Sequence, residues 1–503
     1  MVTGKPARTA ALVLVSGAAA SALLADFGRF HRIHQGDTVL STLISLYHWT
    51  PFYWDQNRFG MLIPLLAIPF RNPFWNLIFQ CGVSLFAGLG ALMLLVRYVA
   101  TDSNWPLAAL IAALAVFAAG PHSPLFQAFW PDQVYAPGLA TLLLGLLLLS
   151  PSSALQDRRL SLARRSAGVA LIAIAYWVYM ATPFLAIPLM LLRRAFVERR
   201  SDPGGKQDPF FDRHLISLIA LFASLALAYW AFARLGPNPS TSLNPLPLGR
   251  WPHAWWALAR QGWDVWSSRP PSAALLAPAL VGAALIAVPS WREQASRGLR
   301  AAAALIYCAV IYFFEVSASR WVQTNLFAVR YVYPSFMMFH AALAILSAVA
   351  AAALLGRRAE PVVRLGSLPL LCGGALWAFG APSVARVRAD LDETLGQRTP
   401  DVLEARCTHL AGDPWTVWPT VFHANWKLYE AGEHAVIVGV SEHSGSLLAA
   451  RPPGPPEQLR VCVPIGDKDA EEAQMYLLRY SFPKLESGGR HGTIEVFVAA
   501  ANR

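Results

Sequence analysis

Apolar runs that are long enough, or nearly long enough, to cross a bilayer recur along most of the chain. Polar stretches separate them, and the runs themselves contain few charges, which is typical of transmembrane helices. The pattern predicts a polytopic α-helical membrane protein, with candidate spans at about 9–25, 74–96, 105–120, 134–150, 214–236, 272–290, 302–316, 331–355 and 366–382.

Residues 166–192 form an apolar run that is long for one span and too short for two full ones. Basic clusters at 158–165 and 193–206 flank it. If the run enters the membrane and returns, both clusters and the later basic loops lie in the cytoplasm, as the positive-inside rule requires. We therefore predict a short hairpin that is broken near Thr182 and Pro183. The total becomes about eleven membrane segments, with the N-terminus inside and the C-terminus outside.

The first outer loop, residues 26–73, is long for a connector and carries several polar and aromatic side chains. Structureless loops of this length are uncommon and usually functional. Asp37 lies early in it, within HQGDTVL, where a carboxylate at the mouth of a membrane cavity can act as a general base. The alternative is that Asp37 caps a helix beginning at Thr38.

The pattern changes after residue 382. Short alternating runs predict strands at 435–441, 459–465 and 492–500, and a helix is expected around 415–429. We therefore divide the chain into a membrane module, 1–382, and a small soluble α+β domain, 383–503. The tail also holds Cys407 and Cys462, and the sequence leaves open whether they pair.

Composition supports the membrane interpretation. Of the 503 residues, 55% are hydrophobic and only 14% are charged, and the mean hydropathy is +0.41, which excludes an ordinary soluble enzyme. The net charge of +11 comes from short clusters between apolar runs, so it does not indicate a nucleic-acid partner.

Other outer-face residues are candidates for binding. Asp132, in FWPDQVYAPG, could bind an acceptor or a metal, or cap the next span. Arg330 and Tyr331 begin a late span, where the guanidinium could hold a lipid phosphate or simply snorkel to the interface. Further candidate substrate contacts are His34, Asp55, Arg58 and His122, although Asp55 and Arg58 could instead form a local ion pair.

Several other chemistries lack their sequence signals. The chain has no P-loop, no dinucleotide fingerprint, no HExxH and no GxSxG on a strand–helix turn, so an ATP-driven pump or a serine hydrolase is unsupported. No spacing of His, Asp or Glu resembles a metal site, so no metal ligand is assigned. The sequence leaves open whether the protein requires a divalent metal.

Together these features resemble the GT-C superfamily of membrane glycosyltransferases. Its members carry a catalytic acidic residue near the start of the first outer loop, which Asp37 matches, and often a second in the next outer loop, which Asp132 matches. A short hairpin such as 166–192, a late outer Arg such as Arg330 and a soluble outer domain are also typical. The motif GDT lacks the adjacent acidic pair of many relatives, which leaves the subfamily and the sugar open.

The resemblance implies an inverting transfer of sugar from a polyprenyl-phosphate carrier to a glycan, lipid or protein acceptor, at the outer face of a bacterial cytoplasmic membrane. Asp37 would be the base, Arg330 would hold the lipid phosphate, and the C-terminal domain would be periplasmic. Membrane lipids and the lipid-linked donor are the implied partners, and no further cofactor is assigned. The alternatives are a lipid-linked sugar transporter or flippase, a polymerase or ligase of another membrane fold, and a non-catalytic scaffold.

Overall fold

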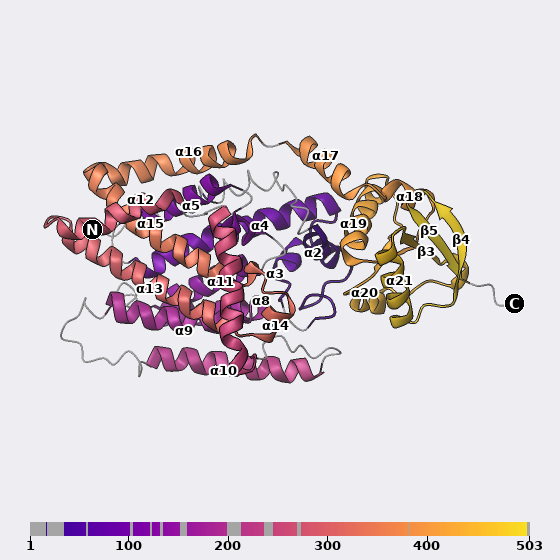
Figure 1. Cartoon of the computed structure of the whole chain (residues 1–503), viewed down its shortest axis with the longest axis horizontal. Coiled ribbons are helices and arrows are strands. Elements are labelled where there is room, and N and C mark those ends of the chain that lie inside the picture. Colours follow the sequence, from indigo (N-terminus) through magenta and orange to yellow (C-terminus); the bar gives the residue numbers. More distant parts are fainter. Residues whose placement is uncertain are drawn as a thin grey trace. The chain divides into compact units, whose positions relative to one another are not determined.

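The structure is a computed structural model that describes residues 17, 35–56, 59–100, 104–120, 123–130, 134–150, 158–198, 213–235, 245–268, 273–381 and 383–499. The chain divides into two compact units (Figure 1). Unit 1 comprises Met1–Leu24 and Ser84–Ala381, and unit 2 comprises Ala25–Val83 and Pro382–Arg503.

Unit 1 is a helix bundle. Its longer elements are the second part of α4 (Pro73–Val99), α5 (Trp105–Ala119), α7 (Tyr135–Leu149), α8 (Arg158–Val178), α9 (Thr182–Arg193), α10 (Arg213–Leu235), α11 (Trp251–Ser268), α12 (Ala273–Ala284), α13 (Arg292–Ser317), α15 (Tyr333–Leu355) and α16 (Ala359–Phe379). Its short helices are α6 (Pro124–Gln127), α14 (Arg320–Thr324), the 3-10 turns η3 (Leu248–Arg250), η4 (Leu285–Ala287), η5 (Val329–Val332) and η6 (Gly356–Arg358), and the π-helical turn η1 (Arg194–Glu198).

Among the described residues, five helices are long and apolar enough to cross a membrane: Pro73–Val99, His214–Ala231, Arg292–Ser317, Val329–Leu355 and Ala359–Ala378. Three shorter apolar helices lie at Trp105–Ala119, Tyr135–Leu149 and Ala273–Ala287. The chain is therefore mostly helical and has the character of a membrane protein. The predicted span at 9–25 falls almost entirely outside the described residues, and the total of about eleven segments stays a prediction.

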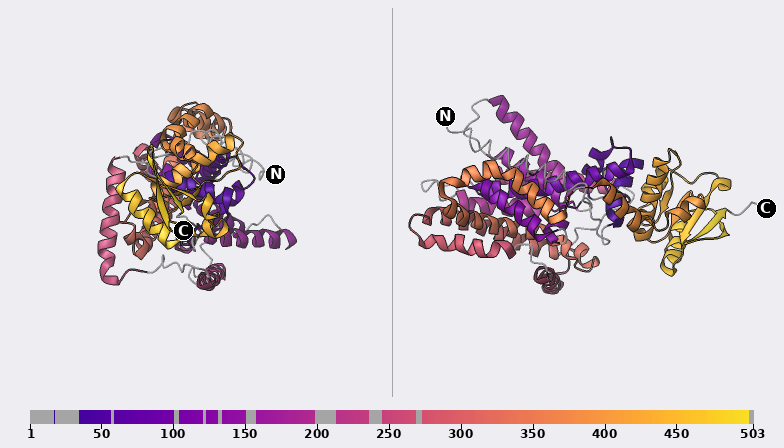
Figure 2. Two further views of the ribbon diagram at one scale, coloured as in Figure 1. Left: turned by 90° about the vertical axis from the view of Figure 1, so that its right-hand side faces the viewer. Right: turned by 90° about the horizontal axis from the view of Figure 1, so that it is seen from above.

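Helix α15 is the centre of the bundle, because 72% of its most apolar window is buried, against 17% for α10. Helices α12 and α13 pack closely on it. At Gly282 on α12, an added Cβ would lie 1.9 Å from the backbone oxygen of Leu346, so only glycine permits this approach. Helix α11 runs crosswise over the surface of the bundle (Figures 1 and 2), as expected for an amphipathic helix that lies along a membrane surface.

The segment predicted as a hairpin is broken between Val178 and Thr182, with Pro183 in the first turn of α9. Its two basic ends meet at one place. The Arg164 Nη2 donates to the Ser150 carbonyl over 2.6 Å, and the Arg193 Nη1 donates to the Ser150 hydroxyl over 3.3 Å. Ser150 follows the C-terminal end of α7, so both ends of the segment lie on the same side of the bundle, as a hairpin requires.

Unit 2 contains a five-stranded sheet in the order β2-β1-β3-β5-β4. Strands β1 (His409–Ala411), β2 (Val438–Val440) and β3 (Arg460–Pro464) are parallel, whereas β5 (Ile494–Ala499) runs antiparallel to β3 and to β4 (Leu485–His491). Its helices are α2 (Gln35–Tyr47), α3 (Leu62–Ala67), the start of α4, α17 (Val384–Leu395), α18 (Thr399–Glu404), α19 (Pro414–Glu430), α20 (Gly445–Ala450) and α21 (Asp467–Arg479), with a 3-10 turn η7 (Pro456–Gln458).

One hydrophobic core joins the first outer loop to the tail in unit 2. The ring of Trp54 lies 6.0 Å from that of Trp418 on α19, and Phe74 stacks on Trp426 at 5.4 Å. All four side chains are fully buried or nearly so. The two units divide between Ala381 and Pro382, one residue from the predicted division, and residues 25–83 belong to the unit that contains the tail.

A disulfide between Cys407 and Cys462 resolves the pairing that the sequence left open. It joins the turn before β1 to the middle of β3, and the two cysteines are 55 positions apart in the sequence. Closing a loop of this length restricts the unfolded chain and stabilises the unit.

Candidate functional site

Asp37 lies in the first turn of α2, inside the helix rather than before it. The alternative that Asp37 caps a helix starting at Thr38 is therefore wrong, because the helix already includes Gln35 and Gly36. Its position still places a negative charge at the positive end of the helix dipole, which stabilises the ionised carboxylate.

Tyr53 holds the Asp37 carboxylate. The phenol hydroxyl of Tyr53 donates to the Oδ1 of Asp37 over 3.1 Å, and both residues are half-buried. The start of α2 is also fixed from the tail, because a Cβ added at Gly36 would lie 2.8 Å from the indole of Trp415 on α19. The Tyr53 hydroxyl therefore helps to orient the carboxylate, which is carried on a helix whose N-terminal end packs against the tail.

Asp55 has a structural role that the sequence did not indicate. Its carboxylate accepts from the backbone N–H of Gly445 at 2.6 Å, and from the backbone N–H and hydroxyl of Ser446 at 2.7 and 2.8 Å. The two backbone N–H groups lie in the first turn of α20, where they have no partner within the helix. Asp55 therefore caps a helix about 390 residues away in the chain. The backbone of Asp55 is left-handed, with φ of 56°, a region that Asp adopts more readily than most residues.

His443, just before α20, contacts the same loop. Its ring meets that of Tyr53 edge to face at 5.2 Å, and the Nε2 of His443 lies 3.1 Å from the side-chain amide of Gln56. The residue that orients Asp37 is thus itself packed against a residue of the C-terminal segment. No short sequence motif could have revealed this, since the contacting residues are about 390 positions apart.

Arg330 and Tyr331 lie in unit 1, in the turn η5 that leads into α15. The guanidinium carbon of Arg330 lies 5.3 Å from the ring centroid of Tyr331, and its Nη2 donates to the Tyr331 hydroxyl over 3.3 Å. The Tyr331 side chain is buried and the Arg330 side chain is half-buried. This arrangement fixes a permanent positive charge next to the first turn of an apolar helix.

A cluster of tyrosines, which the sequence analysis missed, surrounds this turn. Tyr135 at the start of α7 meets Tyr179 at 5.2 Å and Tyr333 at 5.9 Å, both edge to face. Tyr179, in the break of the hairpin, shares a hydrogen bond with Tyr312 near the end of α13. These tyrosines form no sequence motif. The signal that could have revealed them is that each lies near the end of an apolar helix.

The other predicted site residues cannot be placed. His34, Arg58, His122 and Asp132 lie outside the described residues, so their roles stay predictions. Among the residues that the structure does describe, no group of three or more His, Cys, Asp or Glu side chains could hold a metal ion.

The carboxyl ends of the parallel strands, where α/β sheets commonly bind ligands, carry acidic side chains. Asp413 caps α19 by accepting from the Trp415 N–H at 3.1 Å, and its N–H donates to Asp469 over 3.2 Å. A hydrogen bond to Asp413 raises the pKa of Lys468, and burial raises the pKa of Asp469. Because carboxylates already occupy the starts of α19 and α20, this edge does not suit a nucleotide phosphate.

Comparison with solved structures identifies the fold. The chain is similar to ArnT from Cupriavidus metallidurans bound to undecaprenyl phosphate, with a TM-score of 0.51 and 13% sequence identity over 98% of both chains. The apo state of the same protein gives a TM-score of 0.49. The chain therefore has the fold of ArnT, in line with the membrane-glycosyltransferase fold expected from the sequence. No protein-family model matches the chain, and no sequence among curated proteins matches it.

Proposed function

We propose that this chain is an integral membrane glycosyltransferase that transfers a sugar from a polyprenyl-phosphate carrier to a glycan, lipid or protein acceptor. The observation that carries the proposal is Asp37, which stands in the first turn of the first outer helix of a chain with the ArnT fold. The ArnT structure contains undecaprenyl phosphate, which supports a lipid-linked donor for this chain as well.

In the proposed reaction, Asp37 accepts the proton of an acceptor hydroxyl. The acceptor oxygen forms a bond to the anomeric carbon from the face opposite the phosphate, and the bond from that carbon to the phosphate oxygen breaks. The products are the glycosylated acceptor with inverted configuration, protonated Asp37 and the polyprenyl phosphate. The donor already contains an activated phosphoester, so the step requires no nucleotide.

Tyr53 supports the base in two ways. Its hydroxyl donates to the Oδ1 of Asp37, which fixes the orientation of the carboxylate. A hydrogen bond to the ionised form also stabilises it, so Tyr53 contributes to keeping Asp37 ionised. Tyr53 is therefore a positioning residue in this proposal.

Arg330 serves the leaving group in the same proposal. A guanidinium stays charged at any physiological pH and can form two parallel hydrogen bonds to a phosphate. Its contact with Tyr331 restricts the guanidinium before the lipid arrives, which reduces the reorganisation needed as negative charge develops on the phosphate.

The same proposal gives the chain's location. The basic ends of the hairpin, which meet at Ser150, are assigned to the cytoplasmic side by the positive-inside rule. The Cys407–Cys462 disulfide supports an oxidising compartment for the tail. We therefore assign unit 2 to the periplasmic side of a bacterial inner membrane.

The test is release of polyprenyl phosphate by the purified chain in nanodiscs, supplied with a panel of polyprenyl-phosphate sugars and acceptors. We expect release by the wild type, and a loss of at least about 100-fold in Asp37→Asn, because asparagine cannot accept the proton. Asp264→Asn, the same change at an exposed position on α11, is the matched control and should keep full activity.

Equal release by the wild type and Asp37→Asn would remove Asp37 as the base. An absence of release with every donor would contradict the transferase and favour the lipid-linked sugar transporter, which a flipping assay with the same donors would then detect.

A further inference from the structure

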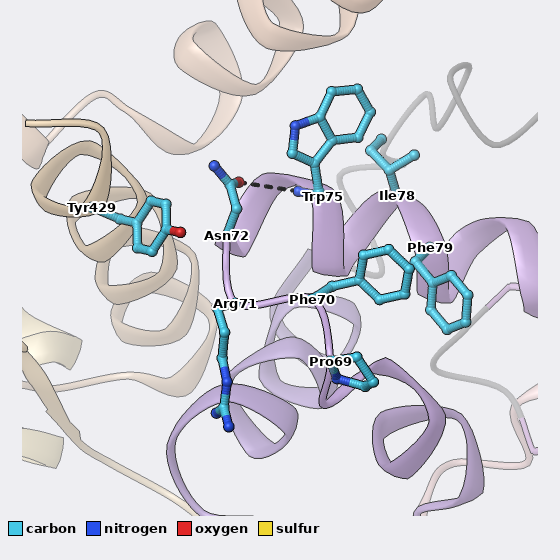
Figure 3. Close-up of a pocket in the computed structure, with 8 residues that line it drawn as sticks. All are labelled: Pro69, Phe70, Arg71, Asn72, Trp75, Ile78, Phe79 and Tyr429. Carbon is cyan, nitrogen blue, oxygen red and sulfur yellow. Dashed lines mark hydrogen bonds between the residues drawn. The ribbon is translucent and has the colours of Figure 1, made fainter. Parts of the chain in front are cut away.

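A cavity of about 660 Å³ lies in unit 2, beside the first turns of α4 (Figure 3). Its lining is mostly apolar and aromatic, and the residues that form it are Pro69, Phe70, Arg71, Asn72, Trp75, Ile78, Phe79 and Tyr429. Seven of them come from the turn before α4 and from α4 itself, and Tyr429 comes from the C-terminal end of α19. None of them belongs to the site proposed for the reaction.

The cavity follows the boundary of a predicted membrane span. Helix α4 begins at Pro73 and is long and apolar enough to cross a bilayer. Ile78 and Phe79 lie one to two turns into this helix, whereas Arg71 and Asn72 precede it. Phe70 stacks on Phe79 with ring centroids 4.4 Å apart, so the segment before α4 packs against the helix itself. With α4 as a membrane span, the apolar end of the cavity would lie at membrane depth and the polar end at the height of the lipid headgroups.

The polar end presents donors. Arg71 is exposed and makes no hydrogen bond or ion pair with any other residue in the described part of the chain. The side-chain oxygen of Asn72 accepts from the Trp75 N–H at 3.2 Å, so its amide nitrogen is the part that points away from Trp75 (Figure 3). The Tyr429 ring faces Asn72 across the cavity (Figure 3). A guanidinium, an amide N–H and a phenol are thus present in the lining of an otherwise mostly apolar cavity.

We propose that this cavity binds the headgroup of an anionic bilayer phospholipid, with the phosphodiester at Arg71 and the first carbons of an acyl chain over Phe70 and Phe79. Charge complementarity favours this occupant, because one guanidinium matches the single negative charge of a phosphodiester. A free polyprenyl phosphate is a monoester, and a phosphate monoester carries close to two negative charges near neutral pH. A neutral sugar would leave the guanidinium without a partner.

The bound lipid would join two parts of unit 2 that are far apart in sequence. Arg71 and Asn72 belong to the first outer loop, and Tyr429 belongs to the C-terminal segment. The lipid would therefore attach the loop and the tail to the membrane at the same point. This inference rests on α4 as a membrane span and is independent of the proposed reaction.

The full-length chain in detergent is equilibrated with equal amounts of phosphatidylglycerol and phosphatidylcholine, and the bound lipids are measured by native mass spectrometry. We expect wild type to retain phosphatidylglycerol in preference to phosphatidylcholine. Arg71→Gln should reduce that preference by about five-fold, which corresponds to the roughly 1 kcal/mol of attraction that a single basic residue has for anionic lipid. Arg71→Lys should restore part of the preference, since the charge returns without the bidentate geometry.

Arg250→Gln is the matched control, since Arg250 is also exposed and lies next to the crosswise helix α11. It should leave the preference unchanged. Equal losses in Arg71→Gln and Arg250→Gln would overturn the proposal, because they would show general attraction to anionic lipid. Displacement of phosphatidylglycerol from the wild type by a stoichiometric amount of polyprenyl phosphate would also overturn it, by assigning the cavity to the carrier lipid.

Tyr429→Phe provides a second variant that retains the ring and removes the hydroxyl. We expect a smaller loss of the phosphatidylglycerol preference from it than from Arg71→Gln.

Discussion

In the helix bundle of unit 1, many side-chain hydrogen bonds end on a backbone carbonyl, of the same helix or of a neighbouring one. In unit 2, by contrast, charged and polar side chains connect distant parts of the chain. Within the bundle, His340 on α15 lies 2.8 Å from the Ala112 carbonyl on α5, and Arg164 donates to the Ser150 carbonyl. In unit 2, Asp55 receives three hydrogen bonds from the start of α20.

The difference follows from the two solvents. In lipid, backbone groups are satisfied within each helix, so the helices need few polar cross-links and pack through small residues such as Gly282. Unit 2 has short strands and helices whose ends need partners from elsewhere. The lesson is that residues 25–83, which lie next to the membrane part in sequence, depend physically on the C-terminal segment. A site that contains Asp37 therefore depends on the tail as well.

The largest expected effect is that of acid, which should destabilise unit 2 more than the helix bundle. His409 on β1 is buried, and burial lowers its pKa from 6.5 to about 4. The unfolded chain binds this proton below pH 6.5 whereas the folded unit does not until about pH 4, so stability falls as the pH drops through that window. The shift corresponds to a loss of up to about 3 kcal/mol for this residue. Hydrogen exchange of the full-length chain, corrected for intrinsic rates, should show protection lost in β1 and α19 before it is lost in α7, which contains no histidine.

His409→Phe sharpens this prediction. Phenylalanine keeps a ring against Phe482, which His409 meets edge to face at 5.4 Å, but it cannot bind a proton. The variant should lose less protection between pH 6.5 and 4 than the wild type does. An identical pH dependence in the two proteins would contradict the assignment to His409.

Asp55→Ala should have the next largest effect. It removes the cap of α20 and leaves the Gly445 and Ser446 N–H groups without their partner, at a cost of about 2 kcal/mol to unit 2. Protection against hydrogen exchange should fall at α20 and, because of the shared core, also around Trp54. Ser446→Ala removes only the hydroxyl, which donates to the Asp55 carboxylate and accepts from the Asp55 N–H, and should cost about half as much. A loss confined to the 50–60 loop would show that the loop and the tail are not coupled.

Arg164→Gln should have the smallest effect on stability. Polar contacts between membrane helices are worth about 0.6 kcal/mol on average, so breaking the contact to Ser150 should barely change the unfolding of the bundle. The hairpin itself is better tested by labelling. Single cysteines at Leu162 and Phe196 should both react with a membrane-impermeant reagent only from the cytoplasmic side. Labelling of the two positions from opposite sides would show a single crossing.

Much of unit 1 could be predicted from sequence, because span length and charge asymmetry are local signals. Pro183 marked the break that the structure has between α8 and α9. In unit 2, β3 and β5 alternate clearly enough to be found, but β1 has only three residues and β4 is polar and glycine-rich, so neither was predicted. The sequence predicted a helix near Asp37 but placed its start at Thr38, whereas α2 already includes Gln35. The contacts of Asp55 with Ser446 span 391 residues and leave no local trace.

The pH–rate profile of polyprenyl phosphate release, measured for wild type and Tyr53→Phe, tests most directly whether an oriented Asp37 is the base. The phenol donates to Asp37 over 3.1 Å and stabilises the ionised form, so its removal should raise the pKa of the base. We predict that the acid limb of the profile moves to higher pH in Tyr53→Phe. At a pH where the base is fully ionised, the rate should fall by less than about ten-fold. An acid limb that stays at the same pH in both proteins would contradict the account.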